Sequence, residues 1–180
     1  MDPRRSGVAP RLFRDMMAGV CAPVTVVTTT DHNGKPSGAT VSSLASLSME
    51  PPLITVAFAR GSRVLAQILA ARRFGVNLLG HAQAELATLF ASREADRFGR
   101  CEWHTEDGLP RLNGAAGWLA CELHEAVEGG DHLLLLGHVV GASRAELPPL
   151  VYAHRTFGTH SRYEERRRPA ITDALAALAR

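Results

Sequence analysis

A run of short β-strand patterns joined by tight-turn sequences is the feature that most constrains how this chain can fold. Residues 23–30 are dense in Val and Thr, which favour strands. Asn33-Gly34 follows, and this pair is preferred in two-residue hairpin turns because both central residues need a positive φ. Residues 38–48 form the predicted returning strand, which ends at Pro51-Pro52 because proline lacks a donor for the ladder. The sequence therefore predicts an antiparallel hairpin near its start.

The remaining patterns extend this hairpin into a larger sheet. Apolar runs and alternations predict strands at 53–59, 74–79, 117–127, 132–142 and 150–153. Apolar side chains at three- and four-residue spacing predict helices at 12–20, 62–71, 83–91 and 171–178, and residues 93–113 read as polar and irregular. Strands dominate and mostly follow one another through tight turns. We therefore expect a mainly β fold, a largely antiparallel β-barrel with peripheral helices.

Charge and composition exclude several functions. The chain of 180 residues suits one domain, and its 20 basic and 18 acidic side chains give a formal net charge of +2. Nucleic-acid binding needs a concentrated basic excess, so we do not expect it. No apolar run reaches the roughly 18 residues of a membrane span, and the N-terminus has no secretory pattern. These features predict a cytoplasmic protein that does not bind membranes.

The motifs of several enzyme classes are missing from the sequence. The cysteines form no C-x-x-C pair and the histidines no H-x-x-x-H or H-E-x-x-H pair, so neither a disulfide framework nor a metal site is predicted. There is no G-x-S-x-G elbow, no Walker-type loop and no G-x-G-x-x-G between a strand and a helix. A nicotinamide would therefore have to bind without a Rossmann unit.

A strip of small hydroxyl side chains is the strongest candidate for ligand binding. If 38–48 is one strand, alternation places four hydroxyls on one face and three apolar side chains on the other: Thr40, Ser42, Ser46 and Ser48 against Val41, Ala45 and Leu47. Hydroxyls and backbone amides can hold a phosphate, and small side chains let a flat ligand lie close. The alternative, which the pattern alone favours, is a solvent-facing strand with an apolar back.

Two further positions have both a functional and a structural interpretation. Ser62-Arg63 opens a predicted helix, where free amides, a hydroxyl and a guanidinium make an anion site; the alternative is a capped helix with a solvated Arg. His132 follows a Gly-Gly turn at the start of a long strand, where its ring could donate a hydrogen bond or supply charge near neutral pH; a lone His is more often structural.

A series of short motifs runs in a specific order from residue 13 to residue 158. These motifs are FRDMM at 13–17, PVTVVTT at 23–29, GATVSSLASLSMEPPL at 38–53, RFGVNLL at 73–79, GGDH at 129–132 and PLVY at 149–152. Together they resemble the short-chain flavin reductase family, the reductase halves of two-component flavin monooxygenases. The resemblance implies an FMN-binding split barrel over 1–161, followed by a charged tail with a short helix at 162–180.

The resemblance also implies a set of site residues in a homodimer with flavin near the subunit interface. The positions that match flavin contacts are Gly38, Ala39, Thr40, Ser42, Ser43, Ala57, Phe58, Ala59, Ser62, Arg63 and Phe90. His132 matches a catalytic residue associated with nicotinamide placement, and Arg155, Phe157 and Gly158 match the C-terminal side of that pocket. The family often has Asn or Gln near Val41 and Ser42, so this chain departs from it at the ring edge.

The implied reaction is hydride transfer from NADH or NADPH to FMN or FAD, with the reduced flavin passing to a partner monooxygenase. The cofactor supplies the redox chemistry, while the protein supplies stacking, orientation and electrostatics. An electron-carrying or non-catalytic protein with tightly held FMN is the alternative within the same fold. A homodimeric interaction domain without a ligand is a third hypothesis, from a different class.

Overall fold

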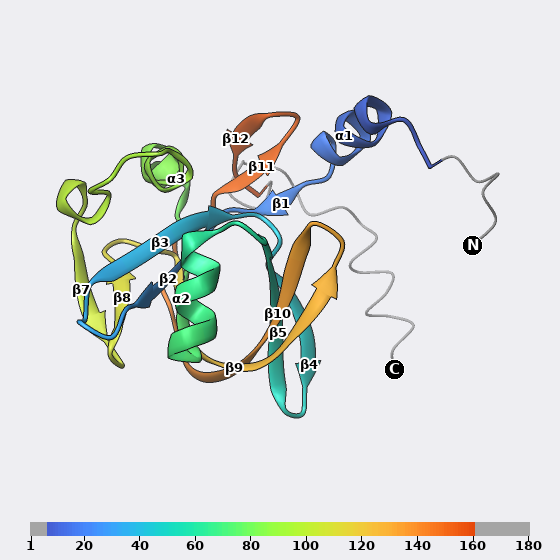
Figure 1. The fold of residues 1–180 in the computed structure, drawn as a ribbon. Coiled ribbons are helices and arrows are strands. Elements are labelled where there is room, and N and C mark those ends of the chain that lie inside the picture. The colour runs from blue at the N-terminus through green and yellow to red at the C-terminus, as the bar shows by residue number, and fades with distance from the viewer. Residues whose placement is uncertain (1–6, 161–180) are drawn as a thin grey trace, which may run out of the picture.

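The computed structural model describes residues 7–160, and its main element is one antiparallel sheet of seven strands in the order β3-β2-β6-β9-β10-β5-β4 (Figure 1). The large sheet contains β2 (Thr25–Thr30), β3 (Pro36–Val41), β4 (Ala45–Met49), β5 (Pro52–Ala59), β6 (Arg73–Leu78), β9 (Gly117–Gly129) and β10 (His132–Arg144). Two small sheets contain β1 (Ala22–Pro23), β11 (Val151–Ala153) and β12 (Thr156–Gly158), and β7 (Trp103–Glu106) and β8 (Leu109–Leu112). The helical elements are α1 (Pro10–Ala18), α2 (Arg63–Ala71), α3 (Ala84–Ala91), η1 (His81–Gln83) and η2 (Phe98–Arg100). The predicted mainly β, antiparallel fold is confirmed.

The connection between β3 and β4 forces this sheet to curl. These strands are consecutive in the chain but occupy the two opposite edges of the seven-stranded sheet. Six spacings of about 4.8 Å would separate the edges of a flat sheet by roughly 29 Å. The link from Val41 to Ala45 spans at most about 15 Å, since consecutive Cα atoms lie 3.8 Å apart. The sheet therefore closes into a barrel whose seam lies at residues 42–44.

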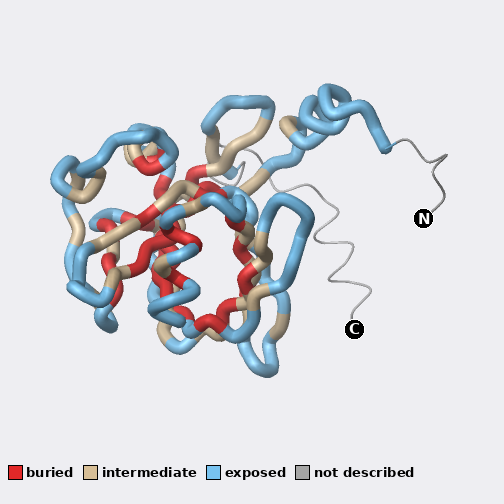
Figure 2. The backbone as a smooth tube through the Cα atoms, viewed as in Figure 1, coloured by how far each residue is buried: buried red, intermediate tan, exposed pale blue. Residues whose placement is uncertain are grey.

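The barrel interior is filled by alternate side chains of its strands. On β5, Ile54, Val56 and Phe58 point inward and pack with Leu135 of β10. Helix α2 adds three buried side chains to the same cluster, namely Val64, Leu65 and Ile68. Figure 2 shows this inner layer as buried, whereas α1 is mostly exposed and has no buried residue. Within residues 7–160, no helix has the length and apolar character to span a membrane.

The predicted turn at Asn33-Gly34 differs from the observed one. The β2–β3 hairpin is present, but of these two residues only Gly34 has a positive φ, at 77°. The Gly34 amide donates to the Asp31 carbonyl, and the Asp31 carboxylate accepts from the amides of Asn33 and Lys35 at 2.9 Å. This side chain stabilises a longer loop in which Asn33 keeps an ordinary backbone conformation. The two-residue turn was therefore wrong, although the hairpin was right.

The predicted single strand over 38–48 is also wrong. It breaks at 42–44, and its two halves, β3 and β4, pair with different partners. A register shift between Ser46 and Ser48 further interrupts the alternation in β4. As a result only Val41 of the predicted apolar back is buried, whereas Ala45 is exposed and Leu47 is 52% exposed.

Residues 93–113 are more ordered than predicted. They contain the hairpin β7–β8, whose turn residues Asp107 and Gly108 both have positive φ, at 51° and 75°. Asp-Gly is a strong hairpin signal, and the sequence interpretation missed it because the flanking strands have only four residues each. Strand β12 was missed for its brevity. The helix predicted at 171–178 and the tail 162–180 lie outside the described residues.

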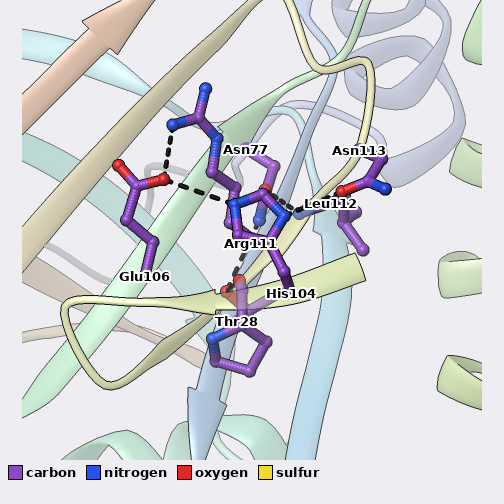
Figure 3. A network of polar contacts seen from close by, with 8 residues as sticks. Thr28, Asn77, His104, Glu106, Arg111, Leu112 and Asn113 are labelled. Carbon is purple, nitrogen blue, oxygen red and sulfur yellow. Dashed lines mark hydrogen bonds and ion pairs between the residues drawn. The ribbon is translucent and has the colours of Figure 1, made fainter. Parts of the chain in front are cut away.

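A buried amide fixes the β7–β8 hairpin to the barrel (Figure 3). Asn77 of β6 is fully buried; its Nδ2 donates to the Val26 carbonyl at 3.1 Å, and its Oδ1 accepts from the Leu112 amide at 2.7 Å. Thr28 of β2 donates its hydroxyl to the Pro110 carbonyl at 2.6 Å. Without these bonds the Leu112 amide and the polar atoms of the Asn77 side chain would be buried and unsatisfied.

Replacing Asn77 by Ala should lower the free energy of unfolding by about 3 kcal/mol, because it leaves the buried Leu112 amide without its acceptor and opens a cavity in the core. Asn113→Ala is the matched control. Asn113 is also an asparagine of this network, but it is exposed, and in Figure 3 its side chain bonds the His104 ring. That control should cost about 0.5 kcal/mol or less. Urea unfolding measures both, and a cost below about 1 kcal/mol for Asn77→Ala would contradict this role.

Candidate functional site

Three segments meet where β5 ends, beside the barrel seam. Ser43, in the link between β3 and β4, accepts a hydrogen bond from the Ala57 amide at 2.8 Å through its hydroxyl oxygen. Along β5, Ala57 pairs with Leu134 of β10, and Ala59 pairs with His132. Directly opposed residues lie on the same face of an antiparallel sheet. Ser43, Ala57, Ala59 and His132 thus form one row, which we call the seam row.

The seam row lies on the outer face of the barrel and carries small side chains. On β5 the inward Phe58 is 4% exposed, whereas Ala57 is half-buried and Ala59 is exposed. Of the predicted contacts on this strand, Ala57 and Ala59 can therefore present side chains, and Phe58 only its backbone. Because methyl groups project so little, a flat ring could approach the strand backbone closely here.

Helix α2 begins directly beyond the row. The Ser62 amide donates to the Ala59 carbonyl at 2.9 Å, and the Ser62 hydroxyl accepts from the Leu65 amide at 3.3 Å. Ser62 is therefore the N-cap that the sequence predicted. Arg63 is exposed and forms no ion pair with another residue of 7–160. A helix N-terminus and a free guanidinium thus adjoin the end of the seam row.

Strand β3 does not present the hydroxyl strip that the sequence predicted. The Thr40 hydroxyl donates to the Ala87 carbonyl of α3 at 2.7 Å, so this face of β3 is covered by a helix. Gly38 is buried on the same face, where a Cβ atom would lie 2.9 Å from the Phe90 ring. On the opposite face, Ala39 packs against the barrel core. The exposed hydroxyls near the seam are therefore those of Ser42 and Ser43.

Phe90 is not at the surface, contrary to its predicted contact with a ligand ring. Its side chain is 1% exposed and packs edge-to-face on Phe98, with ring centroids 5.1 Å apart. Helix α3 turns its apolar face inward, which places Phe90 behind β3. This residue supports the strand from the core, and the absence of a side chain at Gly38 makes room for it.

His132 is held by its neighbour in the chain. Its Nδ1 lies 2.8 Å from Oδ1 of Asp131, and its side chain is 46% exposed. A carboxylate can only accept, so Nδ1 donates the hydrogen, which leaves Nε2 free to face a ligand. The hydrogen bond from His132, followed by the attraction of its charge, lowers the pKa of Asp131 below its ordinary value.

The predicted C-terminal side of the pocket lies on another part of the chain. The β11–β12 hairpin carries Arg155, whose Nη2 donates to Oδ1 of Asp15 in α1 at 2.8 Å. Phe157 packs on Tyr152 with ring centroids 5.1 Å apart, and Gly158 pairs with Val151. No hydrogen bond or ion pair within residues 7–160 joins this hairpin to His132. The contacts of this hairpin within one chain run to α1 and β1.

Arg60 is a residue near the row that the sequence interpretation missed. Its Nε donates to the Gly130 carbonyl at 2.8 Å, and its guanidinium pairs with Glu128. The sequence contained a signal for it: Arg60 directly follows one predicted strand, and Gly129-Gly130 lie just before the strand that pairs with it.

Two open hollows in the surface lie away from the seam row. An open depression of about 750 Å³ lies beside the end of α3 and is lined by Leu89, Arg93 and Arg100, among others. A second, of about 400 Å³, lies between the end of β2 and α2. Among residues 7–160, no group of three side chains is placed to hold a metal ion. Neither of these two hollows is lined by a residue of the seam row.

Replacing His132 by Ala should raise the pKa of the Asp131 carboxyl toward its ordinary value, because it removes the largest cause of the lowering. Arg60→Met should raise it less, since the attraction of Arg60 is the smallest cause. Carbon-13 NMR of the Asp131 carboxyl during a pH titration measures both effects. An unchanged titration in His132→Ala would show that the two side chains do not interact.

Comparison with known proteins gives this site a context. Residues 17–161 match the family described as Flavin reductase like domain. The chain is 40% identical over 162 residues to an NADH:riboflavin 5'-phosphate oxidoreductase of Streptomyces pristinaespiralis, covering 88% of this chain and 92% of that protein. It is 36% identical to the reductase component of a 4-nitrophenol 4-monooxygenase/4-nitrocatechol 2-monooxygenase of Rhodococcus opacus, covering 87% and 86% of the two chains.

A solved structure and two longer relatives complete the comparison. The NADH:FAD oxidoreductase SgcE6 of Streptomyces globisporus, in complex with NAD and FAD fragments, superimposes with a TM-score of 0.81 at 28% identity, over 87% of this chain and 96% of that chain. Two relatives from Rhizobium meliloti, a probable flavin reductase and a stachydrine N-demethylase reductase subunit, are longer: the chain spans 49% and 63% of their lengths.

Proposed function

This chain belongs to the family of flavin reductase like domains, and from that premise we propose that it is an NAD(P)H-dependent flavin reductase, in which FMN or FAD accepts hydride from NADH or NADPH beside the seam row. The observation that carries the proposal is the row itself. Ser43 bonds Ala57, and Ala59, two residues further along β5, pairs with His132, so three segments of the chain meet on one surface. Small exposed side chains at one end and an oriented imidazole at the other suit a flat ring with a second ring stacked upon it.

The residues around the row fit a flavin nucleotide. Ala57 and Ala59 would hold the isoalloxazine, since their small side chains would allow it to approach the strand backbone closely. The N-terminus of α2 would hold the flavin phosphate, because Ser62 caps the helix and Arg63 has no anionic partner among the described residues. Ser42 and Ser43, with the backbone of Gly38, Ala39, Thr40 and Phe58, line the remaining edge. Phe90 contributes from the core by supporting β3.

His132 acts on the nicotinamide side of the row. Asp131 accepts its Nδ1 hydrogen, which fixes the plane of the imidazole and keeps Nε2 directed away from the carboxylate. In that orientation Nε2 can bond a nicotinamide or its phosphate and hold its ring over the flavin. Flavin supplies the redox chemistry when bound, while the chain supplies stacking, orientation and exclusion of water. Near-attack positioning of the two rings is the main catalytic contribution.

His132→Ala should leave flavin affinity within about 2-fold and raise the Michaelis constant for the nicotinamide, or slow flavin reduction, by on the order of 10-fold. His124→Ala is the matched control, an exposed histidine on the neighbouring strand β9. The assay mixes protein with NADH or NADPH and excess FMN or FAD without oxygen and follows flavin bleaching. If the wild-type protein reduced only one equivalent of bound flavin and none of the excess, it would instead be an electron carrier with tightly held flavin.

We further propose that the protein works as a homodimer that supplies reduced flavin to a partner monooxygenase in the cytoplasm. The similarity to the R. opacus reductase component supports the partner. The apolar face of α1 supports the dimer, because its large side chains are half to two-thirds exposed: Leu12, Phe13, Met16 and Met17. Arg155 ties α1 to the β11–β12 hairpin. A second copy would then bring Arg155, Phe157 and Gly158 to the His132 of the first.

A double variant, Phe13→Glu with Met16→Glu, should sediment as a monomer of about the 19.4 kDa chain mass, whereas the wild type sediments as a dimer. Charges on the apolar face cannot be buried without a large desolvation cost. Arg14→Glu, on the polar face of the same helix, should remain dimeric. Analytical ultracentrifugation with circular dichroism of each variant decides this. A monomeric wild type, or a dimeric double variant, contradicts the proposed interface.

A further inference from the structure

Arg60 holds the turn that carries His132. It follows β5 directly and lies opposite the β9–β10 turn, because Ala59 pairs with His132. The Arg60 amide donates to the Asp131 carbonyl at 3.1 Å, and its Nε donates to the Gly130 carbonyl at 2.8 Å. Its Nη2 pairs with the Glu128 carboxylate. One residue thus contacts three of the four positions that precede His132.

Arg60 also lies between the two proposed ligand sites. On one side, Ala59 is part of the seam row, and its carbonyl accepts from the Ser62 amide at 2.9 Å at the start of α2. On the other side, the clamped turn presents Asp131 and His132. Arg60 therefore links the two sites: its backbone leads to the N-terminus of α2, and its backbone and side chain hold the turn that carries the imidazole. A hairpin tip without such a clamp would move more freely than the strands it joins.

The side-chain contacts of Arg60 are exposed, so they contribute little to the free energy of folding. The side chains of Arg60 and Glu128 are 46% and 71% exposed, and exposed ion pairs contribute little to folding. The bond from Nε to the Gly130 carbonyl constrains the backbone of the turn more directly, since a guanidinium is a planar donor with a fixed geometry. The consequence is geometric: the turn keeps one position relative to β5.

We propose that Arg60 is a positioning residue that sets the distance between the flavin phosphate site at α2 and the nicotinamide side at His132. This inference rests on the proposed function. It differs from a role for Arg60 in binding flavin, because the guanidinium is engaged with the turn by two separate atoms. Loss of the clamp misplaces His132 while the seam row and the helix N-terminus keep their geometry.

The test compares three substitutions at the clamp with one control. Arg60→Met removes both side-chain contacts and keeps the chain length, Arg60→Lys can satisfy only one of them, and Glu128→Gln removes the ion pair but leaves the bond to Gly130. Arg100→Met is the matched control, because Arg100 forms a similarly exposed ion pair with Glu94 at 3.1 Å, in a different loop. Each variant is assayed for flavin affinity by calorimetry and for flavin reduction in anaerobic single turnovers.

We expect Arg60→Met to slow flavin reduction by on the order of 10-fold while flavin affinity stays within 2-fold. Arg60→Lys should recover part of the rate, and Glu128→Gln and Arg100→Met should stay within about 2-fold of wild type. A merely structural role would lower the melting temperature without changing the rate per bound flavin. An unchanged rate in Arg60→Met, a parallel loss of flavin affinity, or an equal loss in Arg100→Met would overturn the proposal.

A second measurement separates failure of the clamp from failure of the proposed function. Amide hydrogen exchange of the ligand-free protein needs no activity, and in Arg60→Met it should quicken about 10-fold at 129–132 but not in β6. If the wild type reduces no flavin with either nicotinamide, the proposed function fails, and this exchange still decides the clamp. Unchanged exchange at the turn overturns the clamp whatever the activity.

Discussion

The short connection between the two edge strands is the constraint on which the rest of the structure depends. Because β3 and β4 are consecutive in the chain but lie at opposite edges of the sheet, residues 42–44 can connect the two strands only if the sheet closes. Closure buries the inward side chains of β5 together with Leu135 of β10, and α2 completes the core with its apolar face. The break in the strand is thus a requirement of the barrel.

The same break creates the candidate site. At the seam the backbone leaves the ladder of β3, and the Ser43 hydroxyl takes over as acceptor for the Ala57 amide. This leaves a low, open surface of small side chains that leads to the start of α2 on one side and to His132 on the other. A ligand that covers this surface meets strand edge, helix N-terminus and imidazole together, which is the combination that the proposed hydride transfer requires.

The sequence predicted the strands and the main helices well, because their apolar periods reflect burial within one chain. It did less well where tertiary contacts outweigh local preference. Asn33-Gly34 suggested a two-residue turn that the Asp31 side chain prevents, while Asp107-Gly108 formed that turn unnoticed. The hydroxyl alternation across 38–48 failed because no local signal marks the seam. Phe90 and Thr40 match flavin contacts by resemblance, and the sequence could not predict their packing because it depends on how α3 lies against β3.

The central claim is that the surface formed by the seam row and the start of α2 binds a flavin nucleotide. Calorimetric titration of FMN and of FAD into the folded protein tests it most directly, because it needs neither nicotinamide nor a partner oxygenase. The account predicts saturable heat that fits one site per chain for at least one of the two nucleotides. A sample that is folded by circular dichroism and gives no heat with either nucleotide would contradict it.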